Sequence, residues 1–298
     1  MNPAGGMIPA GAAFLPAQPP FFAAPLYAPT LRDVFPALPP PGYGVNVNEV
    51  WADNLSAEVD ALRFFAQHAR YVAVTVHYPG VVHGAGQSYE LRTAEERYAI
   101  VKANVDALKP VQVGVAVCAG AGALFAWEFN LRDFHPDADR YATRSVEYLS
   151  SRGLDFDRHR QHGIPMATLT MALRSCGLIH RRPGVSWLTY SGAYHAAYLL
   201  KVITGGSPLP RDMAGFLAAV RRFLGDDVYD VARIADDCPT MPVGLECIAH
   251  RLNLAPPLVS PRLAGANSVL ILQAFITMTF AGGNLDRYRG VLKGLQAL

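Results

Sequence analysis

Charge is scarce in this sequence, which limits the partners that composition alone can indicate. Of the 298 residues, 17% are charged and 51% are hydrophobic, and the formal net charge is +2. A net charge this small does not by itself indicate a nucleic-acid or membrane surface. The apolar fraction is ample for a sizeable core, in one large domain or two small ones.

Long apolar runs are also missing. No stretch reaches the roughly 18 consecutive apolar residues that a membrane-spanning helix needs. Apolar patches near the start are interrupted by prolines, and Arg32 is the first basic side chain. We therefore predict no signal peptide, and a cytoplasmic and nuclear location.

Cysteine is sparse, and the spacing of the cysteines matches no paired-cysteine motif of a zinc site. The four cysteines, Cys118, Cys176, Cys238 and Cys247, form no C-x-x-C pair. This spacing argues against a zinc site and predicts free, mostly buried thiols in a reducing compartment.

The common catalytic motifs are absent as well. The sequence contains no G-x-S-x-G elbow, no Walker loop and no H-E-x-x-H. Three adjacent acidic pairs fall at predicted helix starts or ends, where helix-terminus and solvation roles explain them without a site: Glu95–Glu96, Asp226–Asp227 and Asp236–Asp237. Taken without comparison to known proteins, the residues predict only a mixed α/β domain.

Proline is what the first part of the chain contains in excess. Residues 1–44 hold eleven of the 23 prolines and only two charged residues, Arg32 and Asp33. Such a segment forms neither a helix nor a central strand, so we predict a disordered tail over 1–44. Order is expected to begin near Val45.

The remaining chain predicts strands first and helices later. "YVAVTV" (residues 71–76) is a nearly continuous β-branched run, typical of a strand covered on both faces. Residues 111–117 and 124–131 read as a hairpin around the Gly-rich "CAGAGA". Helices are predicted over 55–62, 94–108, 143–152, 165–176, 192–204, 212–223, 243–252, 265–281 and 284–297, with short strands near 186–190 and 227–231. This order predicts an α/β fold, a central mixed sheet surrounded by many helices.

Eight blocks of the sequence together resemble one known family. They are "VWADNL" (50–55), "YVAVTVHYPGVV" (71–82), "VDALKPVQVGVAV" (105–117), "WEFNL" (127–131), "LDFDRHRQHGI" (154–164), "WLTYSGAYHAAYLLK" (187–201), "VYDVARIA" (228–235) and "AGANSVL" (264–270). In this order and spacing the chain resembles the deadenylase subunits of the CCR–NOT complex, the Caf/Pop-type ribonucleases of the DEDD exonuclease class. The resemblance covers residues 45–298 and implies a single ribonuclease-H-like domain.

The resemblance also implies an activity and partners. Family members shorten the poly(A) tails of messenger RNA from the 3′ end, in a complex with a scaffold subunit and a partner nuclease. They use two divalent ions, magnesium or manganese, held by four carboxylates, with a histidine as general base. Such ions need oxygen ligands and negative charge to offset two dications.

This sequence departs from the family pattern at each of those positions. Thr75 and His77 stand where the first two carboxylates are expected, before the retained turn Tyr78-Pro79-Gly80. His195 replaces the third carboxylate, Asn267 replaces the fourth, and Arg262 replaces the general-base histidine. With no carboxylate among these positions, we predict that no intact catalytic site and no bound cofactor remain, so the chain is a pseudo-deadenylase.

Three alternatives stay open on the sequence. The chain could be an active poly(A)-specific ribonuclease with an altered metal site. A softer ion such as zinc could bind His77 and His195, with Asn267 or a water. Arg262 and the two histidines could attract the phosphates of poly(A) RNA once the metals are absent. Asp230, in the retained "YDV", is expected to cap a helix and not to join a metal site.

Overall fold

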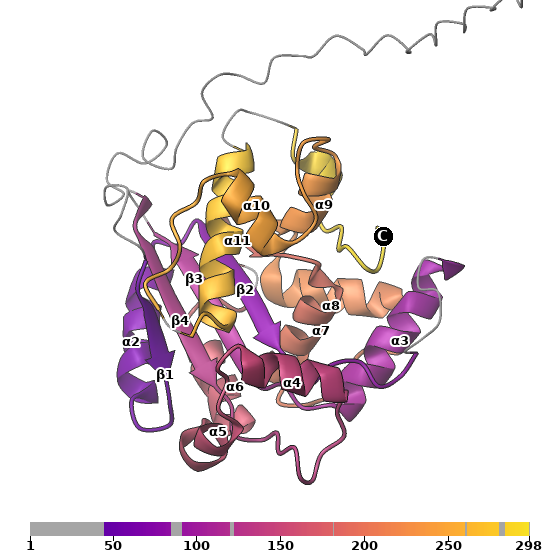
Figure 1. Cartoon of the computed structure of the whole chain (residues 1–298). Helices are drawn as coiled ribbons and strands as arrows, with labels where there is room; N and C mark the ends of the chain where they lie inside the picture. Colours follow the sequence, from indigo (N-terminus) through magenta and orange to yellow (C-terminus); the bar gives the residue numbers. More distant parts are fainter. Residues whose placement is uncertain are drawn as a thin grey trace, which may run out of the picture.

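Six strands form one mixed sheet at the centre of the molecule (Figure 1). The computed structural model describes residues 45–84, 91–119, 122–180, 182–259, 261–279 and 284–297, so the predicted tail 1–44 lies outside the described residues. The strand order is β1-β4-β3-β2-β5-β6, and β3 runs antiparallel to both of its neighbours, whereas the other neighbouring strands are parallel. The strands are β1 (Val47–Val50), β2 (Tyr71–His77), β3 (Gln112–Cys118), β4 (Leu124–Asn130), β5 (Ser186–Thr189) and β6 (Val228–Asp230).

Helices cover both faces of this sheet. The long helix α11 packs across β2, β3 and β4 on one face, together with α9 and α10, and α2 and α7 pack on the opposite face (Figure 1). The helices are α2 (Leu55–Ala66), α3 (Ala94–Ala107), α4 (Thr143–Ser151), α5 (Phe156–His162), α6 (Met166–Ser175), α7 (Gly192–Ile203), α8 (Met213–Leu224), α9 (Val231–Asp236), α10 (Leu245–Arg251) and α11 (Ala264–Thr279), with a short 3₁₀ helix, η3 (Asp286–Tyr288). The predicted mixed sheet surrounded by helices is confirmed.

Side-chain caps fix where several of these helices begin. Thr93 and Glu96 form a capping box at the start of α3, so the acidic pair Glu95–Glu96 lies in the first helical turn, as predicted. Asp155 caps α5 and Asp212 caps α8, each accepting a hydrogen bond from a backbone N–H of the first turn.

The start of α11 is held very close to the sheet. A side chain at Gly114 of β3 would collide with the carbonyl of Ala264, the first residue of α11. Glu128 of β4 accepts a 2.8 Å hydrogen bond from the backbone N–H of Gly265. Glu128 is 3% exposed, and burial raises its pKa to about 7 despite this bond. The contact fixes the position of the first turn of α11, which carries Asn267.

One predicted helix is wrong. Residues 284–297 form only η3, and the rest of the segment is not helical. Gly290 and Gly294 have φ of 70° and 89°, which a right-handed helix does not allow. Backbone groups of the segment bond instead to distant side chains, since Asp230 accepts from Lys293 N and Arg97 donates to the Leu295 carbonyl. Strand β1 and the short helices α5 and α9 were not predicted.

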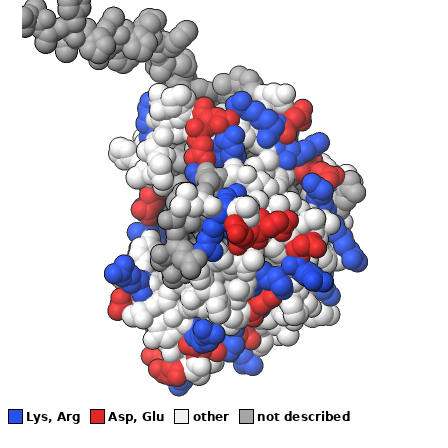
Figure 2. Space-filling model, turned by 90° about the vertical axis from the view of Figure 1, so that its right-hand side faces the viewer, with Lys and Arg blue, Asp and Glu red and all other residues white. Residues whose placement is uncertain are grey.

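The surface mixes both signs of charge. On the face shown in Figure 2, Lys and Arg residues are interspersed with Asp and Glu residues. The four cysteines are free, but only Cys118 and Cys176 are buried, so the predicted burial holds for two of them. Among the described residues, no helix is both long and apolar enough to cross a membrane.

Candidate functional site

Alternation along β2 places Thr75 and His77 on the same side of the sheet. Val72, Val74 and Val76 belong to the hydrophobic cluster on the α2 and α7 side, whereas Ala73 packs in the cluster that contains α11. Because successive side chains of a strand point to opposite faces, Thr75 and His77 follow Ala73 onto the α11 side.

The end of β2 opens into a cavity that brings all five sequence-predicted positions together. The cavity has a volume of about 370 Å³. Thr75 and His77 come from β2, and His195 comes from α7. Asn267 comes from the first turn of α11, and Arg262 comes from the segment just before that helix. A second cavity of about 450 Å³, which also contains His77 and His195, continues along α4 past Arg144.

The two histidines are uncharged at neutral pH. Burial lowers the pKa of His77 to about 3, with His195 as the next cause, and burial lowers the pKa of His195 to about 4. The Nδ1 atom of His195 lies 3.0 Å from the backbone N and 3.1 Å from the carbonyl O of Val76. The two rings therefore bring no positive charge to a phosphate, and among the five positions only Arg262 carries one.

Two divalent cations do not fit this set of side chains. Among the described residues that line the cavity, the only carboxylate is that of Glu246, and it is paired with Arg152 at 2.6 Å. The same lining contains the guanidinium group of Arg262, which is exposed. No group of three His, Cys, Asp or Glu side chains in the described part of the chain could hold a metal ion. Magnesium needs several oxygen ligands, which this lining does not supply.

Sequence reasoning missed several residues that shape the cavity. Tyr148 and Arg152, from α4 and the residue after it, face Glu246 and Cys247 of α10 across the opening. None of these four belongs to a block that resembles the family. Hydrophobic periodicity in the sequence predicts the helices that carry or adjoin them. It cannot show that two helices almost a hundred residues apart meet at one opening.

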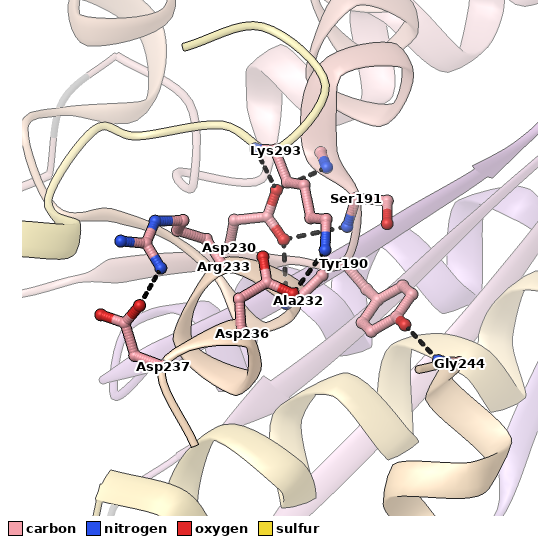
Figure 3. A network of polar contacts seen from close by, with 10 residues as sticks. Tyr190, Ser191, Asp230, Ala232, Arg233, Asp236, Asp237, Gly244 and Lys293 are labelled. Atoms are coloured by element: carbon pink, nitrogen blue, oxygen red, sulfur yellow. Dashed lines mark hydrogen bonds and ion pairs between the residues drawn. The ribbon is translucent and has the colours of Figure 1, made fainter. Parts of the chain in front are cut away.

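Asp230 lies in a different network, at the junction of β6 and α9 (Figure 3). Its carboxylate accepts hydrogen bonds from the backbone N–H groups of Ser191, Gly192, Ala232 and Lys293, at 2.7 to 3.1 Å. The side chain is fully buried, and burial raises its pKa to about 6 against the effect of these bonds. The prediction that Asp230 caps a helix is confirmed, and the helix is α9. The same carboxylate also binds backbone N–H groups at the start of α7, which carries His195.

The mixed sheet with α11 packed across it has a ribonuclease-H-like fold, which it shares with the solved structures described below. The model of the CAF1 family ribonuclease matches residues 50–172. The probable CCR4-associated factor 1 homolog 7 of Arabidopsis thaliana is 30% identical over 262 residues, which are 84% of this chain and 94% of that protein.

Solved structures of CAF1-type and Pop2-type proteins are also similar to this chain. The structure of S. pombe Pop2p with Mg²⁺ and Mn²⁺ bound has a TM-score of 0.74 and 29% identity, covering 84% of this chain and 99% of that one. A chain from the yeast NOT1 MIF4G domain co-crystallised with CAF1 has a TM-score of 0.68 and 25% identity, covering 86% and 99%. This chain belongs to the CAF1 ribonuclease family.

Proposed function

We propose that this chain is a non-catalytic CAF1-type subunit of the CCR4–NOT deadenylation complex. The observation that carries the proposal is the composition of the cavity at the end of β2. All five positions where the family pattern places metal ligands and a base line one cavity, and none of them is a carboxylate. Two-metal hydrolysis requires both ions to clamp the attacking and leaving oxygens, so loss of their ligands removes the reaction.

The electrostatics of the cavity support the same conclusion. Arg262 repels a cation, and His77 and His195 lie where carboxylates would be needed. Replacing even one carboxylate in such a site should cost several kcal/mol of transition-state stabilisation, so replacing all of them leaves nothing to assemble the ions.

The proposal assigns the chain to the complex through its family membership and fold. A related chain is co-crystallised with the NOT1 MIF4G domain, and curated relatives are named for association with CCR4. This chain aligns with 99% of that crystallised chain and with 94% of the Arabidopsis thaliana homolog 7. A subunit that keeps the fold without the ions would occupy the place of an active one.

A tail-shortening assay tests the loss of activity. Full-length protein is incubated with a 3′-polyadenylated RNA and magnesium or manganese, next to an active relative as control. We expect no shortening. Shortening that is abolished by His195→Ala would overturn the proposal and support the second candidate, a ribonuclease with an altered metal site.

A binding assay tests the partner assignment separately. The full chain is mixed with the purified NOT1 MIF4G domain, with the active relative as a positive control. We expect a stable complex, and its absence would remove the role as a subunit even if the chain proves inactive.

A further inference from the structure

The segment that joins α9 to α10 lies between two cavities. Residues 241–248, the partition, comprise the end of the connecting loop and the first turn of α10. On one side is the cavity of about 370 Å³ at the end of β2, lined by residues 244–247. On the other side is a cavity of about 230 Å³, the rear cavity, lined by residues 241–243 and Ile248. Tyr190 lines both, so the partition and this ring separate the two spaces.

Packing holds the partition only loosely. Ile248 is its one buried residue, whereas the side chain of Val243 is 87% exposed. A cavity on each side also removes neighbouring atoms that would contribute dispersion contacts. Segments with few buried apolar contacts open at a lower free energy than the core of a protein. We therefore expect the partition to open more readily than the helices that pack on the sheet.

Two polar contacts hold the partition in place. The backbone N–H of Gly244 donates a 2.8 Å hydrogen bond to the hydroxyl of Tyr190 (Figure 3). In the described part of the chain, no other hydrogen bond joins residues 241–244 to another element. Glu246 pairs with Arg152 at 2.6 Å, and these side chains are 63% and 33% exposed. Ion pairs exposed to this degree are weak, so this contact can break and form again.

The backbone supplies a hinge where the loop meets α10. Gly244 has φ of 103°, which glycine adopts without the strain that other residues suffer. A Cβ atom added to Gly244 would lie 3.7 Å from Sγ of Cys247, an ordinary contact. An alanine at this position would therefore strain the closed backbone without colliding with a neighbour.

From these features we propose that the partition is a gate between the two cavities. The Tyr190–Gly244 and Arg152–Glu246 contacts keep it closed. Opening joins the rear cavity to the space beside Asn267, so the room at the end of β2 is variable. Ionic strength shifts the balance towards the open state, because one of the two contacts is an exposed ion pair. The gate does not depend on whether the chain is catalytic.

The four cysteines of the chain report the opening separately from unfolding. Cys238 is half-buried and lines the rear cavity, Cys247 is exposed, and Cys118 and Cys176 are buried elsewhere. The full chain is pulse-labelled with iodoacetamide, and mass spectrometry measures the rate at each cysteine. Opening uncovers Cys238, whereas only global unfolding uncovers Cys118 and Cys176. Labelling of Cys238 at the same slow rate as Cys118 would overturn the proposal.

Variants of the two contacts should open the gate by different amounts. Tyr190→Phe removes the acceptor of the Gly244 N–H and should accelerate the labelling of Cys238 by about tenfold. Glu246→Gln should accelerate it by about threefold, because the pair is exposed. Neither should accelerate labelling of the two buried cysteines. The matched control is Asp60→Asn, which removes the Arg63–Asp60 pair of α2, with side chains that are 65% and 44% exposed. Equal acceleration by Glu246→Gln and Asp60→Asn would contradict the gate.

A pair of glycine variants tests the hinge. Gly244→Ala should accelerate the labelling of Cys238 by about tenfold, because an alanine strains the closed backbone. Gly177→Ala is the control, since Gly177 has φ of 83° and its added Cβ meets no atom within 4 Å. It carries a similar strain outside the partition and should leave Cys238 unchanged. Unchanged labelling in Gly244→Ala, or equal acceleration in both variants, would overturn the proposal.

Hydrogen exchange and salt test the gate in the unaltered chain. Amides of residues 241–249 should exchange faster than those of α11, and equal protection of the two segments would overturn the proposal. Raising sodium chloride from about 50 mM to about 500 mM should accelerate the labelling of Cys238 by about twofold in the unaltered chain. The same change should have no effect in Glu246→Gln. An equal response to salt in both proteins would show that the Arg152–Glu246 pair does not hold the gate.

Discussion

The ends of strands β6 and β2 differ in the charge and the hydrogen bonding of their polar side chains. At β6, Asp230 keeps its carboxylate and receives four backbone N–H hydrogen bonds. At β2, Thr75 and His77 carry no negative charge, and one buried polar atom on each has no partner. The fold itself supplies every donor that Asp230 needs, whereas carboxylates at the end of β2 would need cations. The comparison shows that the architecture of a site and its chemistry can be separated within one fold.

Restoring the family pattern at β2 should produce the largest effect. In the variant Thr75→Asp, His77→Glu, His195→Asp, Asn267→Asp, Arg262→His, four carboxylates would converge on the cavity. We expect magnesium to raise the thermal midpoint of this variant by several degrees, because bound ions offset the mutual repulsion of the carboxylates. Differential scanning fluorimetry measures the shift, and tail shortening should appear with it.

The matched control keeps Arg262 and changes only the other four positions. The guanidinium group of Arg262 lies in the same cavity and repels cations. Magnesium should therefore raise the thermal midpoint of this control variant by less. An equal magnesium-dependent shift in the unaltered chain would show that the cavity already binds ions, and the comparison of the two strand ends would fail.

Removing the carboxylate at β6 should produce the next largest effect. Asp230→Ala leaves four backbone N–H groups without their acceptor, so the free energy of unfolding should fall by about 3–5 kcal/mol. Asn267→Ala, in the cavity, should change it by less than about 1 kcal/mol, because the Asn267 side chain makes no hydrogen bond to another residue that the structure describes. Urea denaturation monitored by circular dichroism compares the two, and similar losses would contradict the account.

The histidines of the cavity should make stability depend on pH. Their folded pKa values, about 3 for His77 and about 4 for His195, lie below the ordinary 6.5. The contribution of the neutral rings to the free energy of unfolding is therefore complete above pH 6.5. It is lost as the pH falls through the pKa values of the folded state. At about pH 5 each should have cost about 2 kcal/mol, taking about 1.36 kcal/mol per pH unit. Denaturation of the chain and of His77→Gln/His195→Asn, at about pH 5 and about pH 7.5, measures the difference.

Glu128 provides the control of opposite sign. Burial raises its pKa to about 7, so its contribution is complete below its ordinary value of 4.5 and is lost as pH rises through about 7. Glu128→Gln should therefore gain stability relative to the unaltered chain towards neutral pH. A histidine variant that shows no relative gain at about pH 5 would mean that the rings are not buried as neutral groups.

The smallest predicted effect concerns the unpaired hydroxyl of Thr75. Thr75→Val removes a buried group without a partner, so stability without ligand should rise by about 1 kcal/mol. Thr170→Val should instead lower it by a similar amount, because the single hydroxyl proton of Thr170 is shared between the carbonyl oxygens of Met166 and Val202, at 2.9 and 2.6 Å. Urea denaturation of both variants checks this. Destabilisation by Thr75→Val would show that its hydroxyl is already paired, with ordered water.

The sequence predicts the long elements of this fold well. The β-branched run at 71–77, the hairpin to Asn130 and the helices α7 and α11 are close to the predicted bounds, because their patterns extend over many residues. Helices α5 and α9 are too short to show a period, and α9 depends on the Asp230 cap. The wrong helix at 284–297 follows from tertiary bonds to Asp230 and Arg97, which no local pattern records.

The candidate site divides in the same way. Its five central positions follow from the resemblance of motifs that flank them, and the structure places all of them along one cavity. The pairing of Arg152 with Glu246 and the neutrality of the two histidines could not be predicted. Both depend on side chains from distant segments and on the burial that their packing creates.

The most direct test of the central claim is a calorimetric titration of the full chain with magnesium and manganese, with a metal-binding relative measured in parallel. The account predicts no saturable heat for this chain and clear binding by the relative. A zinc titration in the same series addresses a site at His77, His195 and Asn267. Saturable magnesium or manganese binding that Asn267→Ala abolishes would contradict the claim that the end of β2 no longer holds the ions.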